Sequence, residues 1–150
     1  MSAYQTAHLD EIAAEQWPYW APIRHHFDIR TFGVNAWRGS DGEEVVKRHT
    51  EAEGGGAPEL YVVMSGRATF DVAGDEIDAP AGTLVFVRDP NAERAAFAKE
   101  DGTVVLSIGA AAEGRAYAPA GWLLASTPER PGPVAQPVFK TGKAWQPHAG

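Results

Sequence analysis

Residues 59–66 have the sequence Glu-Leu-Tyr-Val-Val-Met-Ser-Gly, and residues 74–89 have the sequence Gly-Asp-Glu-Ile-Asp-Ala-Pro-Ala-Gly-Thr-Leu-Val-Phe-Val-Arg-Asp. Each stretch contains one short apolar run, at 60–64 and at 84–87, with glycine or proline close by. Apolar runs of this length that are bounded by turn-forming residues are typical of β-strands. The two stretches therefore predict strands in the middle of the chain.

The same pattern extends outward in both directions, from about residue 27 to residue 109. Short β-favouring runs alternate with turn signals that are rich in Gly, Asp and Pro. The expected strands cover residues 29–37, 44–49, 60–64, 67–73, 75–78, 83–88, 93–98 and 103–109. Such short intervals leave no room for the crossover helices of a parallel sheet, so the pattern predicts an all-β sandwich or barrel.

The spacing within both stretches resembles the two sequence motifs of the cupin superfamily. Glu59 and Gly66 fit the second half of the first motif. Gly74, Pro80 and Gly82 fit the second motif, in which Val85 stands at the position of a His and Asp89 at that of an Asn. The resemblance implies a cupin-type jelly-roll β-barrel of two antiparallel sheets.

In that family, three histidines and one glutamate of these motifs bind a divalent ion inside the barrel. The resemblance places the ligand positions at His49, Glu51, Glu59 and Val85, so a carboxylate replaces one imidazole and a valine replaces another. His49 and Glu51 share a strand face by alternation. The residues 52–58 separate Glu51 from Glu59 by more than the family spacing.

One imidazole and two carboxylates form an oxygen-rich donor set that suits manganese or non-haem iron. Two neighbouring carboxylates without a cation repel each other, so one of them would be protonated, paired with an arginine or exposed to water. Because Val85 cannot ligate a metal, we expect a degenerate site. The expected cofactor is therefore none, or a weakly bound divalent metal such as Mn, Fe, Ni or Zn.

Alternation also predicts the lining of the barrel interior. The expected ligand pocket consists of Tyr61, Val63, Thr83, Val85 and Val87, which suits a small, partly apolar molecule. The alternative is that the same side chains simply fill the barrel. The sequence leaves open whether the strand at 29–37 turns Asn35 and Trp37 or Phe32 and Val34 inward.

The chain divides into an N-terminal arm (1–26), a barrel (27–125) and a Pro-rich C-terminal arm (126–150). A short helix is expected at 9–16, followed by an aromatic cluster formed by Trp17, Tyr19 and Trp20 that anchors the arm or serves as a ligand lid. His25 and His26 are expected to be ordinary surface or strand-edge residues. The arms offer apolar surface, and together with the resemblance this predicts a homodimer, with exchange of arms as one form.

Composition narrows the function classes. The 150 residues are 44% hydrophobic, which suits one domain, and they carry a net charge of −7 with no basic cluster, which argues against nucleic-acid binding. The chain has no cysteine, no apolar stretch long enough for a membrane span and no apolar leader, so we expect a cytoplasmic protein without a membrane partner.

Three functions follow from these observations. The first is a small-molecule-binding barrel with a degenerate metal site. The second is a divalent-metal-dependent enzyme of the dioxygenase, isomerase or lyase type that uses His49, Glu51 and Glu59. The third is a structural or interaction module. The sequence leaves open whether the chain is an enzyme, because one fold hosts many chemistries.

Overall fold

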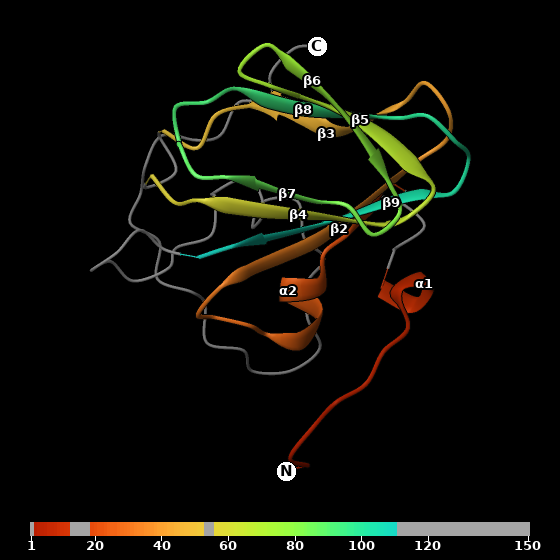
Figure 1. Cartoon of the computed structure of the whole chain (residues 1–150). Helices are drawn as coiled ribbons and strands as arrows, with labels where there is room; N and C mark the ends of the chain where they lie inside the picture. Colours follow the sequence, from red (N-terminus) through yellow and green to blue (C-terminus); the bar gives the residue numbers. More distant parts are fainter. Residues whose placement is uncertain (1, 13–18, 53–55, 111–150) are drawn as a thin grey trace.

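The computed structural model describes residues 2–12, 19–52 and 56–110, and their core is a pair of facing antiparallel sheets (Figure 1). The strands are β1 (Trp20–Ala21), β2 (Gly33–Gly39), β3 (Glu44–His49), β4 (Glu59–Ser65), β5 (Arg67–Val72), β6 (Asp75–Pro80), β7 (Leu84–Val87), β8 (Arg94–Ala98) and β9 (Thr103–Gly109). One sheet has the order β1-β2-β9-β4-β7 and the other the order β3-β8-β5-β6. We call them the five-stranded and the four-stranded sheet.

Each strand that the sequence predicts has a counterpart, which confirms the all-β prediction. From β2 to β9 the chain passes from one sheet to the other at every step except the β5–β6 hairpin, a path consistent with a jelly roll. That hairpin turns on Ala73 and Gly74, which both have positive φ, as the twist of a tight hairpin requires. The first long strand begins at Gly33, later than the expected residue 29.

The core lies between the sheets and is built from small and branched side chains around two rings. Tyr61 and Phe70 face each other from opposite sheets with ring centroids 5.4 Å apart. Ala96 and Ala98 of β8 are fully buried in the same cluster. The alanine-rich segment is thus a strand, as predicted, because its small inward side chains leave room for the larger ones opposite.

The N-terminal region differs from the expectation. His25 and His26 lie in a helix, α2 (Ile23–Phe27), and not at a strand edge, although His26 is exposed, as the surface alternative expected. The residue before this helix is Pro22, whose fixed φ is compatible with a helix start. Together with α1 (Leu9–Ile12), α2 lies against the outer face of the five-stranded sheet (Figure 1).

Trp20 anchors this region to the barrel. Its side chain is 1% exposed, stacks on Trp37 at 6.0 Å and donates its indole N–H to Asn35 Oδ1 at 3.1 Å. Tyr19, in contrast, is exposed. The contacts of Trp20 with Trp37 and Asn35 favour the interpretation that this residue anchors the N-terminal arm to the barrel.

Several expectations lie outside the described residues: the helix beyond Ile12, Trp17 and the C-terminal arm 126–150. None of the helices in the described ranges has the length and apolar character needed to span a membrane.

Candidate functional site

Three side chains that the sequence singles out meet at one end of the two sheets. His49 is the last residue of β3, Glu51 follows it, and Glu59 is the first residue of β4 in the opposite sheet. Each offers one donor atom, and these three atoms lie within 4.8 Å of one another. The structure therefore brings the expected ligand set together despite the longer spacing between Glu51 and Glu59.

A β-bulge determines which residue of β3 faces this site. Val46 pairs with Ala96 and His49 pairs with Arg94, so three steps along β3 match two steps along β8. Residues three positions apart on a regular strand face opposite sides, but the extra residue of the bulge lets both Val46 and His49 point inward. Arg48 binds Asp71 and Glu93 instead, at 2.8 and 3.1 Å.

The imidazole of His49 lies between two carboxylates. Its Nε2 is 3.1 Å from Glu51 Oε1 and 3.6 Å from Glu59 Oε2, while its Nδ1 is 2.6 Å from the carbonyl oxygen of Lys47. Burial is the largest influence and lowers the pKa of His49, but the contacts with Glu51 and Glu59 outweigh it and raise this pKa from 6.5 to about 10. The imidazole is therefore a cation at neutral pH.

Two further residues complete the cluster, and the sequence analysis missed both roles. The Tyr61 hydroxyl donates to Glu59 Oε2 at 2.5 Å, and burial followed by the charge of Glu59 raises the pKa of Tyr61. Arg94 has a fully buried side chain with Nη1 3.4 Å from the same oxygen, and its Nη2 donates to the carbonyl of Asp89 at 3.1 Å. Alternation along the strand could have indicated that Arg94 faces the interior, because it lies two and four positions before the buried Ala96 and Ala98.

The charges of this cluster balance. Two cations, His49 and Arg94, face two carboxylates, Glu51 and Glu59, so the formal charges sum to zero. Neighbouring carboxylates repel each other unless a cation lies close by, and here an arginine is one of the cations that offset this repulsion. The donor set also has the chemistry of a divalent-metal site: after loss of the imidazole proton, His49, Glu51 and Glu59 would hold such an ion.

The position of the missing third imidazole lies close to the cluster. Val85 pairs with Tyr61 and Val87 pairs with Glu59, so Val85 is diagonal to Glu59 on the inward face. Tyr61, Val63, Val85 and Val87 are buried in one apolar cluster, and Thr83 is partly buried. Their role as a ligand pocket stays a prediction.

A polar row continues from Tyr61 across the inward face of the five-stranded sheet. Tyr61 pairs with Ser107, which pairs with Asn35, and Ser107 Oγ accepts the indole N–H of Trp37 at 3.0 Å. This register shows that Asn35 and Trp37, not Phe32 and Val34, face the interior. The next row holds Glu59 opposite Gly109.

Gly109 leaves space beside the cluster. Among the described residues, no atom would lie within 4 Å of a Cβ added at this position, although Glu59 pairs with Gly109 directly. The Nε of Arg94 is buried and has no hydrogen-bond partner within the described part of the chain. Free space and an unsatisfied donor near Glu59 are features of a site that accepts a small molecule.

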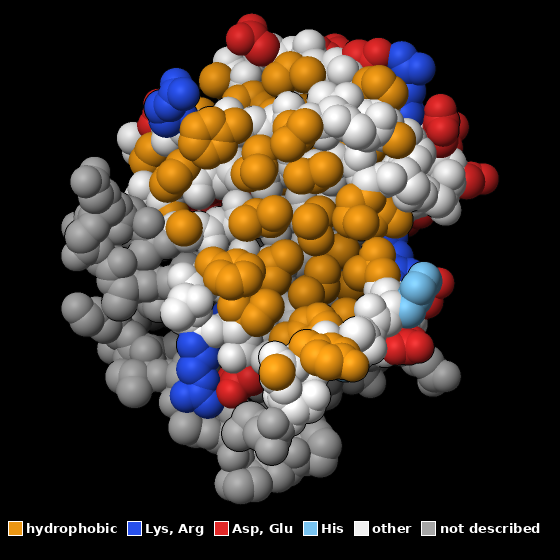
Figure 2. All heavy atoms as spheres, turned by 60° about the horizontal axis from the view of Figure 1, so that its bottom comes forward, with side chains coloured by type: hydrophobic (Ala, Val, Ile, Leu, Met, Phe, Trp, Pro, Cys, Tyr) orange, Lys and Arg blue, Asp and Glu red, His pale blue; other side chains and the backbone are white. Residues whose placement is uncertain are grey.

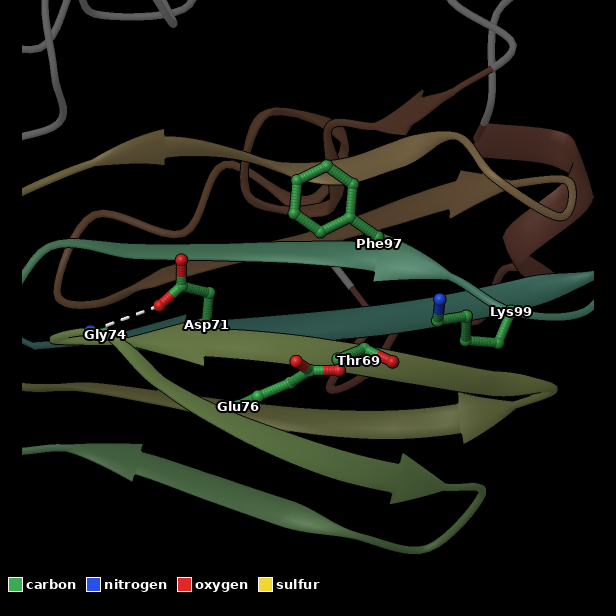
Figure 3. A pocket seen from close by; sticks show the side chains of 6 residues that line it. All are labelled: Thr69, Asp71, Gly74, Glu76, Phe97 and Lys99. Atoms are coloured by element: carbon green, nitrogen blue, oxygen red, sulfur yellow. Dashed lines mark hydrogen bonds between the residues drawn. The ribbon is translucent and has the colours of Figure 1, made fainter.

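A separate shallow groove of about 290 Å³ lies on the outer face of the four-stranded sheet. Figure 3 shows its lining residues, Thr69, Asp71, Gly74, Glu76, Phe97 and Lys99, on the solvent side of the strands. Asp71 is already bonded to Arg48 and to the backbone N–H of Gly74. None of the lining residues of this groove belongs to the cluster around Glu59.

Comparison with known proteins identifies similar folds. No protein-family model matches the chain, and no curated protein matches it in sequence. A cupin protein from Bacteroides fragilis is similar in structure, with a TM-score of 0.61 and 20% identity over 77% of this chain and 90% of that one. An RmlC-like cupin protein from Desulfovibrio desulfuricans has a TM-score of 0.47 and 22% identity over 54% and 73% of the two chains.

Proposed function

Because the chain has the cupin fold, we propose that it is a small-molecule-binding barrel whose charged cluster is balanced without a metal ion. The observation that carries this proposal is the fully buried Arg94 beside Glu59. A buried guanidinium that already neutralises the carboxylate at a ligand position weakens the attraction of that carboxylate for a second cation. The cluster then serves as a polar wall for a ligand.

The charge balance also limits the ligand class. Since the formal charges of the cluster sum to zero, an ionic ligand would introduce an uncompensated charge into a largely buried site, which is unfavourable. We therefore propose an uncharged polar ligand, such as a small polyol or amide. It would occupy the space beside Gly109, which pairs with Glu59.

Tryptophan fluorescence provides a test, because Trp37 is bonded to Ser107 in the polar row next to Tyr61. We would titrate metal-free protein with a panel of small polyols and amides and with a matched panel of small carboxylates. The proposal predicts saturable responses to members of the uncharged panel. Responses to carboxylates alone would contradict the ligand class.

A variant of Gly109 locates the binding site. Gly109→Val should abolish the response, because its side chain would fill the space beside Glu59 while the extended backbone accommodates it. Ile108→Val is the matched control, since residue 108 faces away from the interior. Binding that survives Gly109→Val would place the ligand elsewhere.

A second candidate function is a divalent-metal-dependent enzyme of the dioxygenase, isomerase or lyase type. The observation in its favour is the convergence of His49, Glu51 and Glu59 within 4.8 Å. A divalent ion in place of the imidazole proton would leave the cluster with a formal charge of +1, so this function would favour an anionic substrate. The ligand class thus distinguishes the two candidates.

Isothermal titration of chelator-treated protein with Mn²⁺, Fe²⁺, Ni²⁺ and Zn²⁺ tests the second candidate directly. Binding near one equivalent per chain that disappears in His49→Ala would favour the enzyme over the metal-free barrel. His26→Ala is the control, because His26 lies in α2, outside the cluster. Absence of tight binding would leave the metal-free barrel as the supported function.

A further inference from the structure

The groove on the outer face of the four-stranded sheet lies over Thr69 of β5. Thr69 pairs with Phe97 of β8 on one side and with Asp78 of β6 on the other, so its short side chain lies between two larger ones. Asp78 binds Arg67 in an ion pair, and neither of these two side chains lines the groove. The result is a hollow of about 290 Å³ over a small residue. Ligand pockets have volumes of about 300–1,000 Å³, so this hollow suits a small molecule.

An aromatic side chain sets this groove apart from an ordinary charged surface. Phe97 is the only aromatic residue at the outward positions of β5, β6 and β8, three strands that the structure describes in full. Its side chain is partly exposed and lines the groove. Hydrophobic side chains gather instead on the side of the five-stranded sheet that Figure 2 shows. A single ring among polar neighbours offers contact area to the apolar part of a ligand.

Two opposite charges face the groove without a partner. Glu76 pairs with Asp71, two positions after Thr69. Lys99 lies beside Arg67, two positions before Thr69, because its backbone N–H donates to the Arg67 carbonyl at 2.8 Å. Glu76 and Lys99 therefore stand on opposite sides of Thr69, as Figure 3 shows. Both are exposed, and neither side chain has a hydrogen bond or an ion pair with any residue in the described ranges.

The third charged residue of the groove, Asp71, already has partners. Its carboxylate accepts from Arg48 at 2.8 Å and from the backbone N–H of Gly74 at 3.2 Å. Arg48 binds Glu93 as well, at 3.1 Å. The groove thus offers a ligand one negative charge at one end, one positive charge at the other, and an aromatic ring beside them.

We propose that this groove binds a zwitterion with an apolar body, the class of apolar amino acids and short apolar peptides. Lys99 binds the carboxylate of the ligand, Glu76 binds its ammonium, and the Phe97 ring contacts its apolar part. A ligand with a single charge would leave the other charged residue without a partner. The groove is separate from the cluster around Glu59, so this proposal does not depend on the function proposed above.

The spacing of the two charged residues limits the length of the ligand. Their positions lie four residues apart along β5, which corresponds to about 13 Å of strand. Figure 3 shows that the side chains of Glu76 and Lys99 extend toward the middle of the groove, which shortens the gap between their charges. A ligand of one to about three residues therefore fits, since an extended chain spans about 3.5 Å per residue.

The exposure of both charged groups makes the binding weak and sensitive to salt. Ion pairs between exposed groups contribute little, so we expect a Kd of about 1 mM or higher. Salt at about 1 M shortens the Debye length to about 3 Å and should weaken the binding further.

The test is a titration of the isotope-labelled full chain, followed by the NMR chemical shifts of its backbone amides. The probes are L-phenylalanine and L-alanyl-L-phenylalanine, together with phenylalanine amide, which lacks the carboxylate, and N-acetylphenylalanine, which lacks the ammonium. We expect saturable shifts at the groove residues with the zwitterions and affinities about two- to five-fold weaker for each derivative with one charge. The tighter of the two zwitterions gives the length of the ligand.

Two variants assign each charge of the ligand to its partner. In Lys99→Gln, L-phenylalanine and phenylalanine amide should bind equally, because the contact with the carboxylate is gone. In Glu76→Gln, L-phenylalanine and N-acetylphenylalanine should bind equally for the corresponding reason. Lys47→Gln is the matched control, since Lys47 is exposed on β3 and does not line the groove, and it should bind as the wild type does. A merely structural effect would weaken all probes alike.

Three results would overturn the proposal. The first is the absence of saturable shifts with both zwitterions, and the second is equal affinity of the wild type for the zwitterions and their singly charged derivatives. The third is a set of shifts centred on Glu59 and Tyr61, which would place the ligand in the barrel. The comparison of probes on the wild type needs no variant, so it decides the matter even if a variant fails to fold.

Discussion

At the scale of single residues, the cluster at the end of the barrel is organised around Glu59. One of its oxygens, Oε2, accepts from Tyr61, faces Arg94 and lies 3.6 Å from the His49 imidazole. The side chain of Glu59 is only 16% exposed, and these partners replace part of its lost hydration. The side chains therefore depend on one another, and changes in one should appear in the others.

The charge state of His49 is the first prediction. Its folded-state pKa is raised from 6.5 to about 10, so its contribution to stability is fully present below about pH 6.5 and is lost as the pH rises through 10. NMR titration of the imidazole should therefore show a protonated ring at neutral pH. Glu51→Gln should lower this pKa, whereas Glu76→Gln on the outer face of the same sheet should not; a His49 that titrates near 6.5 in the wild type would contradict the ion-paired geometry.

The second prediction concerns Arg94. Arg94→Met should lower the free energy of unfolding by about 3 kcal/mol, because it leaves a largely buried carboxylate without its cation. Glu59→Gln in the same chain should recover part of that loss, since the uncompensated charge is then removed. Urea denaturation of the two single variants and the double variant measures the coupling, and strictly additive effects would mean that Arg94 and Glu59 act independently.

At the scale of elements, two local features shape the barrel: the bulge in β3, beside the site, and the glycine between β4 and β5, at the opposite end of β4 from Glu59. Gly66 has φ +71°, and a Cβ there would lie 2.7 Å from Thr103 Cα. Thr103 is fully buried and holds the same turn through hydrogen bonds with the backbone of Arg67 and Glu100. Two features therefore require glycine at position 66: the positive φ of its backbone and the close approach of Thr103 in β9.

The third prediction tests this double requirement. Gly66→Ala should destabilise the protein by about 2–5 kcal/mol, the sum of a strained backbone and an overpacked contact. Gly74→Ala is the matched control, because it has φ +87° but no atom from the described part of the chain within 4 Å of the added Cβ, and it should cost only about 1 kcal/mol. Equal losses in the two variants would show that the contact with Thr103 is unimportant.

The fourth prediction uses the diagonal position of Val85. Val85→His should raise the affinity for Mn²⁺, because an imidazole can bridge the diagonal spacing to Glu59 on the same face. Val63→His, two positions further along β4 from Tyr61, should not. Calorimetric titration compares the variants, and no gain in Val85→His would mean that Arg94 prevents metal binding or that position 85 is not the equivalent of the missing ligand.

At the scale of the whole molecule, the two sheets have different surroundings. The outer face of the four-stranded sheet is polar. The five-stranded sheet is covered by α1 and α2 over β2 and β9, and it exposes Met64, Leu84 and Phe86 on β4 and β7.

The fifth prediction follows from mass action. If two copies form the homodimer that the resemblance implies through the exposed apolar side chains of β4 and β7, the midpoint of thermal unfolding should rise with protein concentration, because dissociation accompanies unfolding. Differential scanning calorimetry at several concentrations measures this shift. Phe86→Glu should remove the concentration dependence, while Phe97→Glu should retain it.

The sequence alone determined the strands and the motif residues. Alternation and turn chemistry are local properties. The apolar runs around Tyr61 and Val85 therefore predicted β4 and β7, and the motif spacing predicted where Glu59 and Gly66 lie in the fold. The helix at His25 and His26 was not predicted, because a five-residue helix gives little periodic signal and owes its stability to packing on the sheet.

Only the tertiary structure decided the content of the site. Arg94 and Glu59 are 35 residues apart, on different sheets, and their contact depends on how the two sheets face each other. The bulge that turns His49 inward depends on the register of β3 against β8, which no local pattern specifies. The apolar runs of β4 and β7 were visible in the sequence. Which half of the sheet the helices cover, however, depends on packing between distant segments of the chain. Local propensity therefore fixed the elements, and long-range register fixed the chemistry that they bring together.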